Sequence, residues 1–214
     1  MGVDLDSARH QLFQHLSWEV KDERVIDAMK RVPREEFIPE SQQAFAYQDR
    51  PLSIGYGQTI SQPYIIALMV RALEVTPSDK VLELGTGSGY VAAILGELAQ
   101  KVVSVEIVPE LADSARDVLA RLGYTNVEVH SVPRTTLGWM DDAPYDAIIV
   151  SAGAPSVPQM LVGQLKWGGR LVIPVGSRSQ QDLLRITHLP DGDQVESLGA
   201  CYFVPLLGEG AWRD

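Results

Sequence analysis

The chain has 214 residues, of which 45% are hydrophobic and 21% charged, and its formal net charge is -10 at pH 7. This length and composition predict one globular domain over residues 1–214, and no apolar run approaches the roughly 20 residues that a membrane helix needs. The acidic balance argues against general binding to nucleic acid, which requires an excess of Lys and Arg.

The first part of the chain predicts a helical cap. Apolar residues at helical spacing predict a helix over residues 5–18, and Asp22 can cap a second helix that Pro33 ends. Residues 34–45 predict one more short helix.

A loop and a helix complete the first 75 residues. Residues 47–62 contain too many Gly, Pro and Gln for a regular element, and so long an irregular stretch in a compact domain is usually functional. A helix is predicted over residues 63–73, with Pro63 in its first turn. We therefore expect residues 1–75 to form a helical cap with a substrate-side loop.

Strands and helices alternate from residue 80 onward. The predicted strands cover 81–84, 102–105, 127–130, 147–150 and 170–174, and the predicted helices cover 90–99, 109–122 and 156–165, the last capped by Ser156. Alternating βα units indicate a parallel, doubly wound sheet. Two further strands, over 183–188 and 195–204, flank a turn at 190–193 and predict a closing antiparallel hairpin.

Three glycines at every second position follow the first strand of this sheet. Gly85, Gly87 and Gly89 lie between a strand and a helix, the arrangement that holds a nucleotide-like ligand at a helix N-terminus. Glu106 ends the next strand, where an acid can accept hydrogen bonds from ribose hydroxyls. Glu83 precedes the glycines, and an acid there suits the ammonium and sulfonium of S-adenosylmethionine better than a pyrophosphate. A nicotinamide cofactor, or a plain strand–turn–helix corner, is the weaker alternative.

Several stretches of the chain match one enzyme family. They cover residues 46–52, 54–63, 81–90, 143–150 and 165–176. The glycine motif is common to class I methyltransferases, whereas residues 58–63 are much more specific. On these stretches, residues 37–175 and 204–206 resemble the protein-L-isoaspartate (D-aspartate) O-methyltransferase family.

The resemblance implies a class I S-adenosylmethionine-dependent methyltransferase with no metal. Members methylate the free α-carboxylate of L-isoaspartyl and D-aspartyl residues in damaged proteins and peptides, and the ester then closes to a succinimide. Because the carboxylate is already an anion and the sulfonium is already activated, the protein has mainly to align the reactants and exclude water. No catalytic triad is expected.

The resemblance also implies the site residues. Ser61 is the active-site serine, and we assign its hydroxyl to orienting the substrate carboxylate, since no activating base is near it in sequence. Thr59 is a second donor, and Gln62 contacts substrate or caps the next helix. For Ser61 a plain helix cap, and for Thr59 a local turn, stay open as alternatives.

The cofactor-binding residues are predicted at the glycine motif and at two further places. Tyr90 is expected to pack over the cofactor, and residues 151–155 to face the site. Pro133-Arg134-Thr135 stands where the family has Gly-Asp-Gly, so an acceptor for the adenine amino group is replaced by donors. The predicted set is Glu83, Gly85, Thr86, Gly87, Ser88, Gly89, Tyr90, Glu106, Arg134 and Thr135.

Two other functions stay open at this point. The chain could methylate a different peptide or small-molecule carboxylate, or could be a non-catalytic relative that binds modified peptides. The single Cys201 and the absence of a signal-peptide pattern at the acidic N-terminus favour a cytoplasmic protein. We also expect a monomer that binds neither membrane nor nucleic acid.

Overall fold

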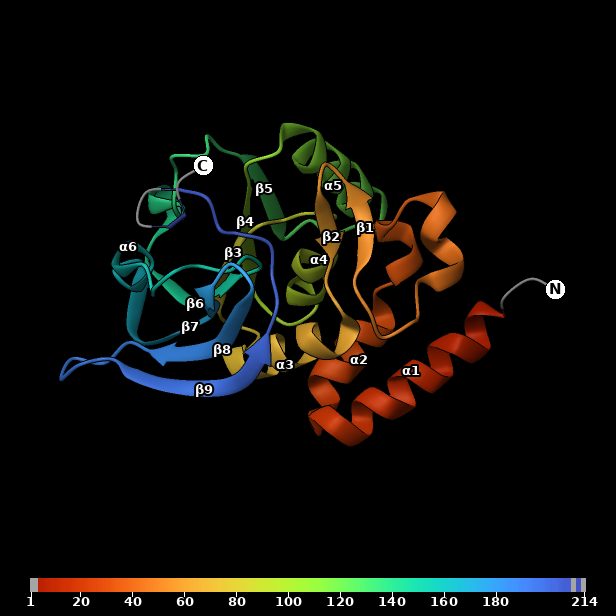
Figure 1. Ribbon diagram of the computed structural model, residues 1–214, viewed down its shortest axis with the longest axis horizontal. Helices are drawn as coiled ribbons and strands as arrows, with labels where there is room; N and C mark the ends of the chain where they lie inside the picture. The colour runs from red at the N-terminus through yellow and green to blue at the C-terminus, as the bar shows by residue number, and fades with distance from the viewer. Residues whose placement is uncertain (1–3, 209–210, 213–214) are drawn as a thin grey trace.

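A seven-stranded sheet with the order β5-β4-β3-β6-β7-β8-β9 forms the centre of the molecule (Figure 1). The computed structural model describes residues 4–208 and 211–212. Pairs among β5, β4, β3, β6 and β7 are parallel, whereas β7–β8 and β8–β9 are antiparallel. The predicted Rossmann-like sheet with a closing hairpin is confirmed. The strands are β3 (Lys80–Leu84), β4 (Lys101–Glu106), β5 (Val127–Ser131), β6 (Tyr145–Val150), β7 (Leu165–Ser177), β8 (Gln180–Thr187) and β9 (Gln194–Cys201).

Both faces of the parallel part of the sheet are buried. Alternate strand residues point to opposite faces, which is why these strands are almost continuously apolar in sequence. One face packs on α3 (Pro63–Leu73), α4 (Tyr90–Gly96) and α5 (Pro109–Arg121). The other face packs on α6 (Gln159–Val162) and on the loop that includes η3 (Met140–Asp142).

The N-terminal cap lies against the same face as α3 (Figure 1). It contains α1 (Leu5–Val20), α2 (Glu23–Arg31), η1 (Arg34–Phe37) and η2 (Glu40–Phe45). Asp22 caps α2 as predicted, accepting from the Arg24 and Val25 backbone N–H groups at 3.1 and 3.3 Å. Apolar side chains of the cap and of the sheet form one continuous core.

The loop predicted over residues 47–62 contains a two-stranded hairpin, so its description as irregular was wrong. Strands β1 (Leu52–Gly55) and β2 (Gln58–Ile60) pair antiparallel, and buried residues alternate with exposed ones along β1. Tyr56 and Gly57, at φ 53° and 72°, make the turn that reverses the chain. Strands this short leave almost no periodic signal in the sequence.

The helix predicted over residues 156–165 is also largely wrong. Helix α6 has only four residues, and its N-cap is Pro158, not Ser156. Gly153 and Ala154 upstream are held extended, since their N–H groups donate to Val204 O and Pro174 O. Downstream, β7 already begins at Leu165, paired with β6. Residues 168 and 169 therefore lie within a strand, and not at the end of a helix.

The single short helix predicted over residues 34–45 is replaced by two 3-10 helices, η1 and η2, and the remaining predicted elements differ only at their ends. Helix α1 continues to Val20, α4 stops at Gly96, and β9 stops at Cys201. Beyond β9 the Phe203 N–H donates to the Gln181 side chain at 2.8 Å, so the strand pairing predicted to residue 204 is broken. In the part of the chain that the structure describes, no helix combines the length and apolar character needed to cross a membrane.

Candidate active site

A cavity of about 510 Å³ opens at the carboxyl edge of β3 and β4. Its walls include parts of the chain that are far apart in sequence. Among them are the glycine turn with the strand ends around it, β2 with residues 61 and 62, and the segment 200–207, which begins in the last two residues of β9. Ligands of open α/β sheets bind at this edge.

Glu83 contributes a fully buried carboxyl group to the cavity wall. The Ser104 hydroxyl donates to its Oε2 at 2.5 Å, and Oε1 is buried without a hydrogen-bond partner among the described residues. Burial raises the pKa of Glu83 to about 8, against the lowering effect of the Ser104 hydrogen bond, and Glu106 adds a further increase. An unpaired buried acid at a cavity wall is suited to a cationic ligand.

The glycine turn provides a cradle without side chains. Gly85, Gly87 and Gly89 all have positive φ, at 89°, 53° and 89°. A Cβ on Gly89 would lie 3.2 Å from the Ala115 Cβ of α5, so the turn packs closely on that helix. Gly85 and Gly87 line the cavity and leave room there for a ligand, whereas Gly89, also predicted to bind the cofactor, is not among the lining residues.

Glu106 ties the glycine turn to the end of β4. Its Oε2 accepts from the Gly87 N–H at 2.8 Å, while Oε1 accepts from the Ile107 and Val108 N–H groups at 2.9 and 3.0 Å. Oε2 keeps a second lone pair for a ligand hydroxyl. Together with Glu83 and the open glycine turn, this arrangement fits S-adenosylmethionine.

The predicted substrate residues line the same cavity as the cofactor motif. Thr59 and Ser61 reach it from β2 and the residue after it, and Gln62 lies beside them. The Gln62 Nε2 donates to Asp49 Oδ2 at 2.9 Å, and the Tyr64 N–H donates to Asp49 Oδ1 at 2.8 Å. Asp49 therefore anchors the start of α3, a role that the sequence had left open to Ser61 or Gln62.

Arg50 does not share the partners of its neighbour Asp49. Its Nε donates to Gln48 Oε1 at 2.7 Å, and its guanidinium lies over the Phe45 ring. Asp49 and Arg50 thus have separate sets of contacts.

The ring of Tyr90 lines the cavity but also contacts the cap. It lies edge-on to Phe37, with ring centroids 5.6 Å apart, and beneath the Arg34 guanidinium, 4.9 Å from the ring centroid. The role of Arg34 was not predicted, because its partners are distant from it in sequence. Packing of Tyr90 over the cofactor stays a prediction.

The loop after β5 contributes Val132, Thr136 and Leu137 to the cavity wall. Arg134 and Thr135, which were predicted to bind the cofactor, are exposed in a turn and are not among the residues that line the cavity. Any contact they make with the adenine stays a prediction.

Other parts of the cavity wall were only partly foreseen. Ser151 and Ala152 line it, whereas the other residues of the predicted segment 151–155 are not among the lining residues. Tyr202, which is exposed, lies at its edge, and no motif in the sequence indicated that residue. Among the described residues, no group of three or more His, Cys, Asp or Glu side chains is placed to hold a metal ion.

Comparison with known proteins identifies the family. The profile described as "Protein-L-isoaspartate(D-aspartate) O-methyltransferase (PCMT)" matches residues 7–211. The chain belongs to this family. A protein-L-isoaspartate O-methyltransferase of Methanoculleus marisnigri is 52% identical over 216 residues, covering 99% of this chain and 98% of the relative. One of Rhodopseudomonas palustris is 54% identical over 197 residues, covering 91% and 90%.

Solved structures of the same family have the same fold. One protein-L-isoaspartate O-methyltransferase superimposes with a TM-score of 0.84 at 29% identity, covering 94% of this chain and 67% of the other. A second, described as the enzyme from Plasmodium falciparum in complex with S-adenosyl-L-homocysteine, gives 0.79 at 25% identity, covering 92% and 97%. The cofactor of this protein-L-isoaspartate O-methyltransferase family is S-adenosylmethionine, in agreement with Glu83, the glycine turn and Glu106.

Proposed function

We propose that this chain methylates the free α-carboxylate of L-isoaspartyl and D-aspartyl residues in damaged proteins and peptides, using S-adenosylmethionine. The product ester closes to a succinimide, which starts repair. One observation carries the proposal: a single cavity is lined both by Thr59, Ser61 and Gln62 and by the glycine turn with its two acids.

The residues of the chain have positioning roles in this reaction. The cofactor supplies a methyl group on a positively charged sulfur. The Ser61 hydroxyl donates a hydrogen bond to one substrate carboxylate oxygen, and Thr59 donates a second. The other oxygen forms the new bond to the methyl carbon as the carbon–sulfur bond breaks and its electron pair stays on sulfur. No proton has to be removed, so the reaction requires no base beside Ser61.

The cofactor end of the site has a separate set of roles. Glu106 accepts from the ribose through the free lone pair of Oε2, and Glu83 faces the positively charged part of the cofactor. The cavity walls from β2 and from residues 200–207 exclude water around the reacting atoms.

The test uses radiolabelled S-adenosylmethionine and two synthetic peptides that differ only in having an isoaspartyl or an aspartyl linkage. We expect base-labile label on the isoaspartyl peptide alone. Label on both peptides would indicate a carboxyl methyltransferase of another specificity. Label on neither, with S-adenosylhomocysteine still bound, would indicate a non-catalytic binder, and both results would contradict the proposal.

We also propose that the protein acts as a cytoplasmic monomer. The predicted substrate residues and the glycine turn of one chain line the same cavity, so both sides of the site come from a single copy, and the single Cys201 suits a reducing compartment. Light scattering that gave the mass of a dimer at assay concentration would contradict the monomer.

A further inference from the structure

Arg34 lies in the cap with no solvent exposure, although it carries a charge. Its Nε donates to the Ala46 carbonyl at 2.9 Å, and its Nη2 donates to the Ser61 carbonyl at 2.8 Å. One guanidinium thus joins the backbone of η2's C-cap to the backbone of the residue proposed to orient the substrate. Burying a charge is costly, so these contacts offset a large desolvation penalty.

The same guanidinium also contacts the cofactor side of the site. Its central carbon lies 4.9 Å from the centroid of the Tyr90 ring. Tyr90 is the first residue of α4 and directly follows Gly89, the last glycine of the turn. Arg34 is therefore in contact with both the substrate side and the cofactor side of the cavity.

We propose that Arg34 is a positioning residue that fixes Ser61 relative to the glycine turn. This inference rests on the proposed function and adds a residue to it. Arg34 stands behind the cavity wall and acts through Ser61 and Tyr90. In-line methyl transfer depends on the separation and angle of oxygen, carbon and sulfur, and an error of about 1 Å can lower a rate by about 100-fold.

A planar guanidinium is required for this set of contacts. It donates to two carbonyls in fixed directions while its central carbon lies over the Tyr90 ring. A Lys ammonium at the same place can donate to one carbonyl but cannot reproduce both hydrogen bonds and the ring contact together. Asp49 supports the neighbouring residues Gln62 and Tyr64 but does not contact the Ser61 carbonyl.

A second Arg in the molecule provides a matched control. Arg170 donates to the carbonyls of Leu73 at 2.6 Å and Glu74 at 2.8 Å and to the Asp79 carboxylate at 2.9 Å, and its side chain is only 15% exposed. It lies in β7 level with Ala147, near the amino end of β6 and away from the cavity. Substitution of Arg170 should lower the stability of the fold as substitution of Arg34 does, but without disturbing Ser61.

The experiment compares Arg34→Lys with Arg170→Lys in the full chain. Thermal unfolding, the Kd for S-adenosylhomocysteine, and kcat and KM for an isoaspartyl peptide are measured for each. For Arg34→Lys we expect kcat to fall by about 10- to 100-fold while the Kd for S-adenosylhomocysteine changes by less than about 3-fold. For Arg170→Lys we expect a comparable loss of Tm with kcat within about 2-fold of wild type. Equal kcat losses in the two variants, or an unchanged kcat in Arg34→Lys, would overturn the inference.

Two further measurements separate this inference from the proposed function. Hydrogen exchange at the amides of residues 58–62 should speed up in Arg34→Lys and not in Arg170→Lys, whether or not the wild type methylates isoaspartyl peptides. Unchanged exchange there rejects the inference, whereas an inactive wild type with the expected exchange rejects only the function.

In a Ser61→Ala background the kcat loss from Arg34→Lys should shrink, and an undiminished loss would show that Arg34 does not act through Ser61. If Arg34→Lys does not fold, Arg34→Gln, which can still donate to one carbonyl, takes its place.

Discussion

Glu83 combines full burial, one hydrogen bond and one unpaired oxygen. Such a group is stable as a neutral acid in the unliganded protein and as a carboxylate when a positive charge lies beside it. The same residue therefore affects both the stability of the unliganded protein and its affinity for the cofactor.

The stability of the unliganded protein should depend on pH through Glu83. Its pKa of about 8 in the fold is above the ordinary value of 4.5, so between these values the folded state binds more protons than the unfolded state. The free energy of unfolding should consequently fall as the pH rises from about 5 to about 8. Residue 83 does not titrate in the variant Glu83→Gln. The Tm of the variant minus that of the wild type should therefore increase as the pH rises across this range. Thermal unfolding at several pH values measures the difference.

Glu110→Gln provides the control, since it removes an exposed carboxylate in the first turn of α5. Its Tm should follow that of the wild type at every pH. If Glu83→Gln behaves in the same way, Glu83 does not carry the proton.

Ser61→Ala should lower kcat more than it affects cofactor binding. Removing one donor from the substrate carboxylate leaves methyl transfer possible but less well aligned, so we expect kcat/KM to fall by about 10- to 100-fold. The Kd for S-adenosylhomocysteine should stay within about 2-fold. Steady-state kinetics with an isoaspartyl peptide and calorimetry measure the two quantities, and a kcat/KM equal to that of wild type would contradict a role for the hydroxyl.

At the scale of residues, the sequence allowed prediction of groups that act near their own motif. Glu83 and Glu106 follow from the strand–turn–helix pattern, because both lie at strand ends that meet at one edge of the sheet. Arg34 and Asp49 could not be predicted, because their roles depend on partners such as the Ser61 carbonyl and the Tyr64 N–H, which only the fold brings close.

At the scale of elements, prediction worked where the hydrophobic pattern was long. The central parallel strands carry continuous apolar runs and α5 carries apolar residues at helical spacing, whereas β2 has only three residues and α6 only four. Short elements are determined by tertiary contacts, as with the bonds that hold Gly153 and Ala154 extended where a helix start was expected.

The loop after β5 offers a test of its own. Restoring the family's Gly-Asp-Gly by Pro133→Gly, Arg134→Asp and Thr135→Gly together supplies an acceptor and two flexible positions. We expect the Kd for S-adenosylhomocysteine to decrease by roughly 10-fold, the equivalent of about one hydrogen bond. Calorimetry measures it, and Arg134→Ala, which removes the donors without adding an acceptor, is the control. Unchanged or weaker binding in the triple variant would mean that this loop has not lost an adenine contact.

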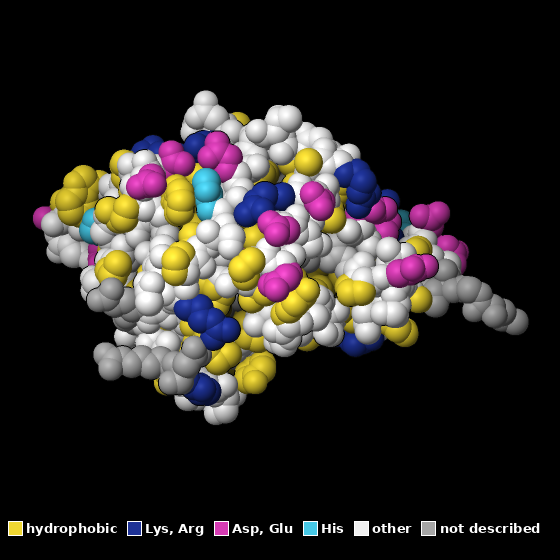
Figure 2. Space-filling view, turned by 90° about the horizontal axis from the view of Figure 1, so that it is seen from above, with side chains coloured by type: hydrophobic (Ala, Val, Ile, Leu, Met, Phe, Trp, Pro, Cys, Tyr) yellow, Lys and Arg dark blue, Asp and Glu magenta, His cyan; other side chains and the backbone are white. Residues whose placement is uncertain are grey.

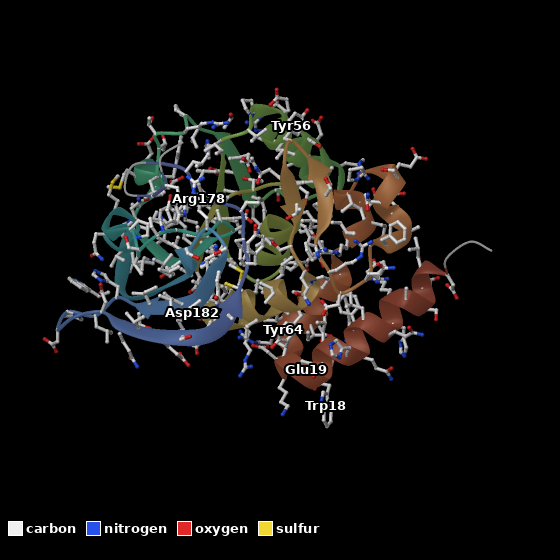
Figure 3. All side chains as sticks on the ribbon, viewed as in Figure 1. Trp18, Glu19, Tyr56, Tyr64, Arg178 and Asp182 are labelled. Carbon is white, nitrogen blue, oxygen red and sulfur yellow. The ribbon has the colours of Figure 1, made fainter. Side chains whose placement is uncertain are left out.

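At the scale of the whole molecule, cap and sheet share one hydrophobic core. Leu16 and Met29 of the cap belong to the same cluster of buried side chains as Val81 and Val102 of the sheet. Seen from above, the surface carries acidic and basic side chains interspersed with hydrophobic ones (Figure 2). The labelled side chains include Tyr56, at the turn of the β1–β2 hairpin, well away from Tyr64 at the start of α3 (Figure 3). The β1–β2 hairpin packs on the same core through Leu52, Ile54 and Ile60.

A shared core predicts that the described parts unfold together. Calorimetry of the ligand-free protein should show one transition with equal calorimetric and van't Hoff enthalpies. S-adenosylhomocysteine at 100 times its Kd should stabilise the fold by about 2.7 kcal/mol. For a domain of this size that raises the Tm by about 5 to 11 °C. Because Arg34 links the cap to the glycine turn, the ligand should shift the whole unfolding transition to higher temperature. Two resolved transitions, of which the ligand shifts only one, would show instead that residues 1–75 form an independent unit, and would also remove the physical basis for coupling Ser61 to the glycine turn.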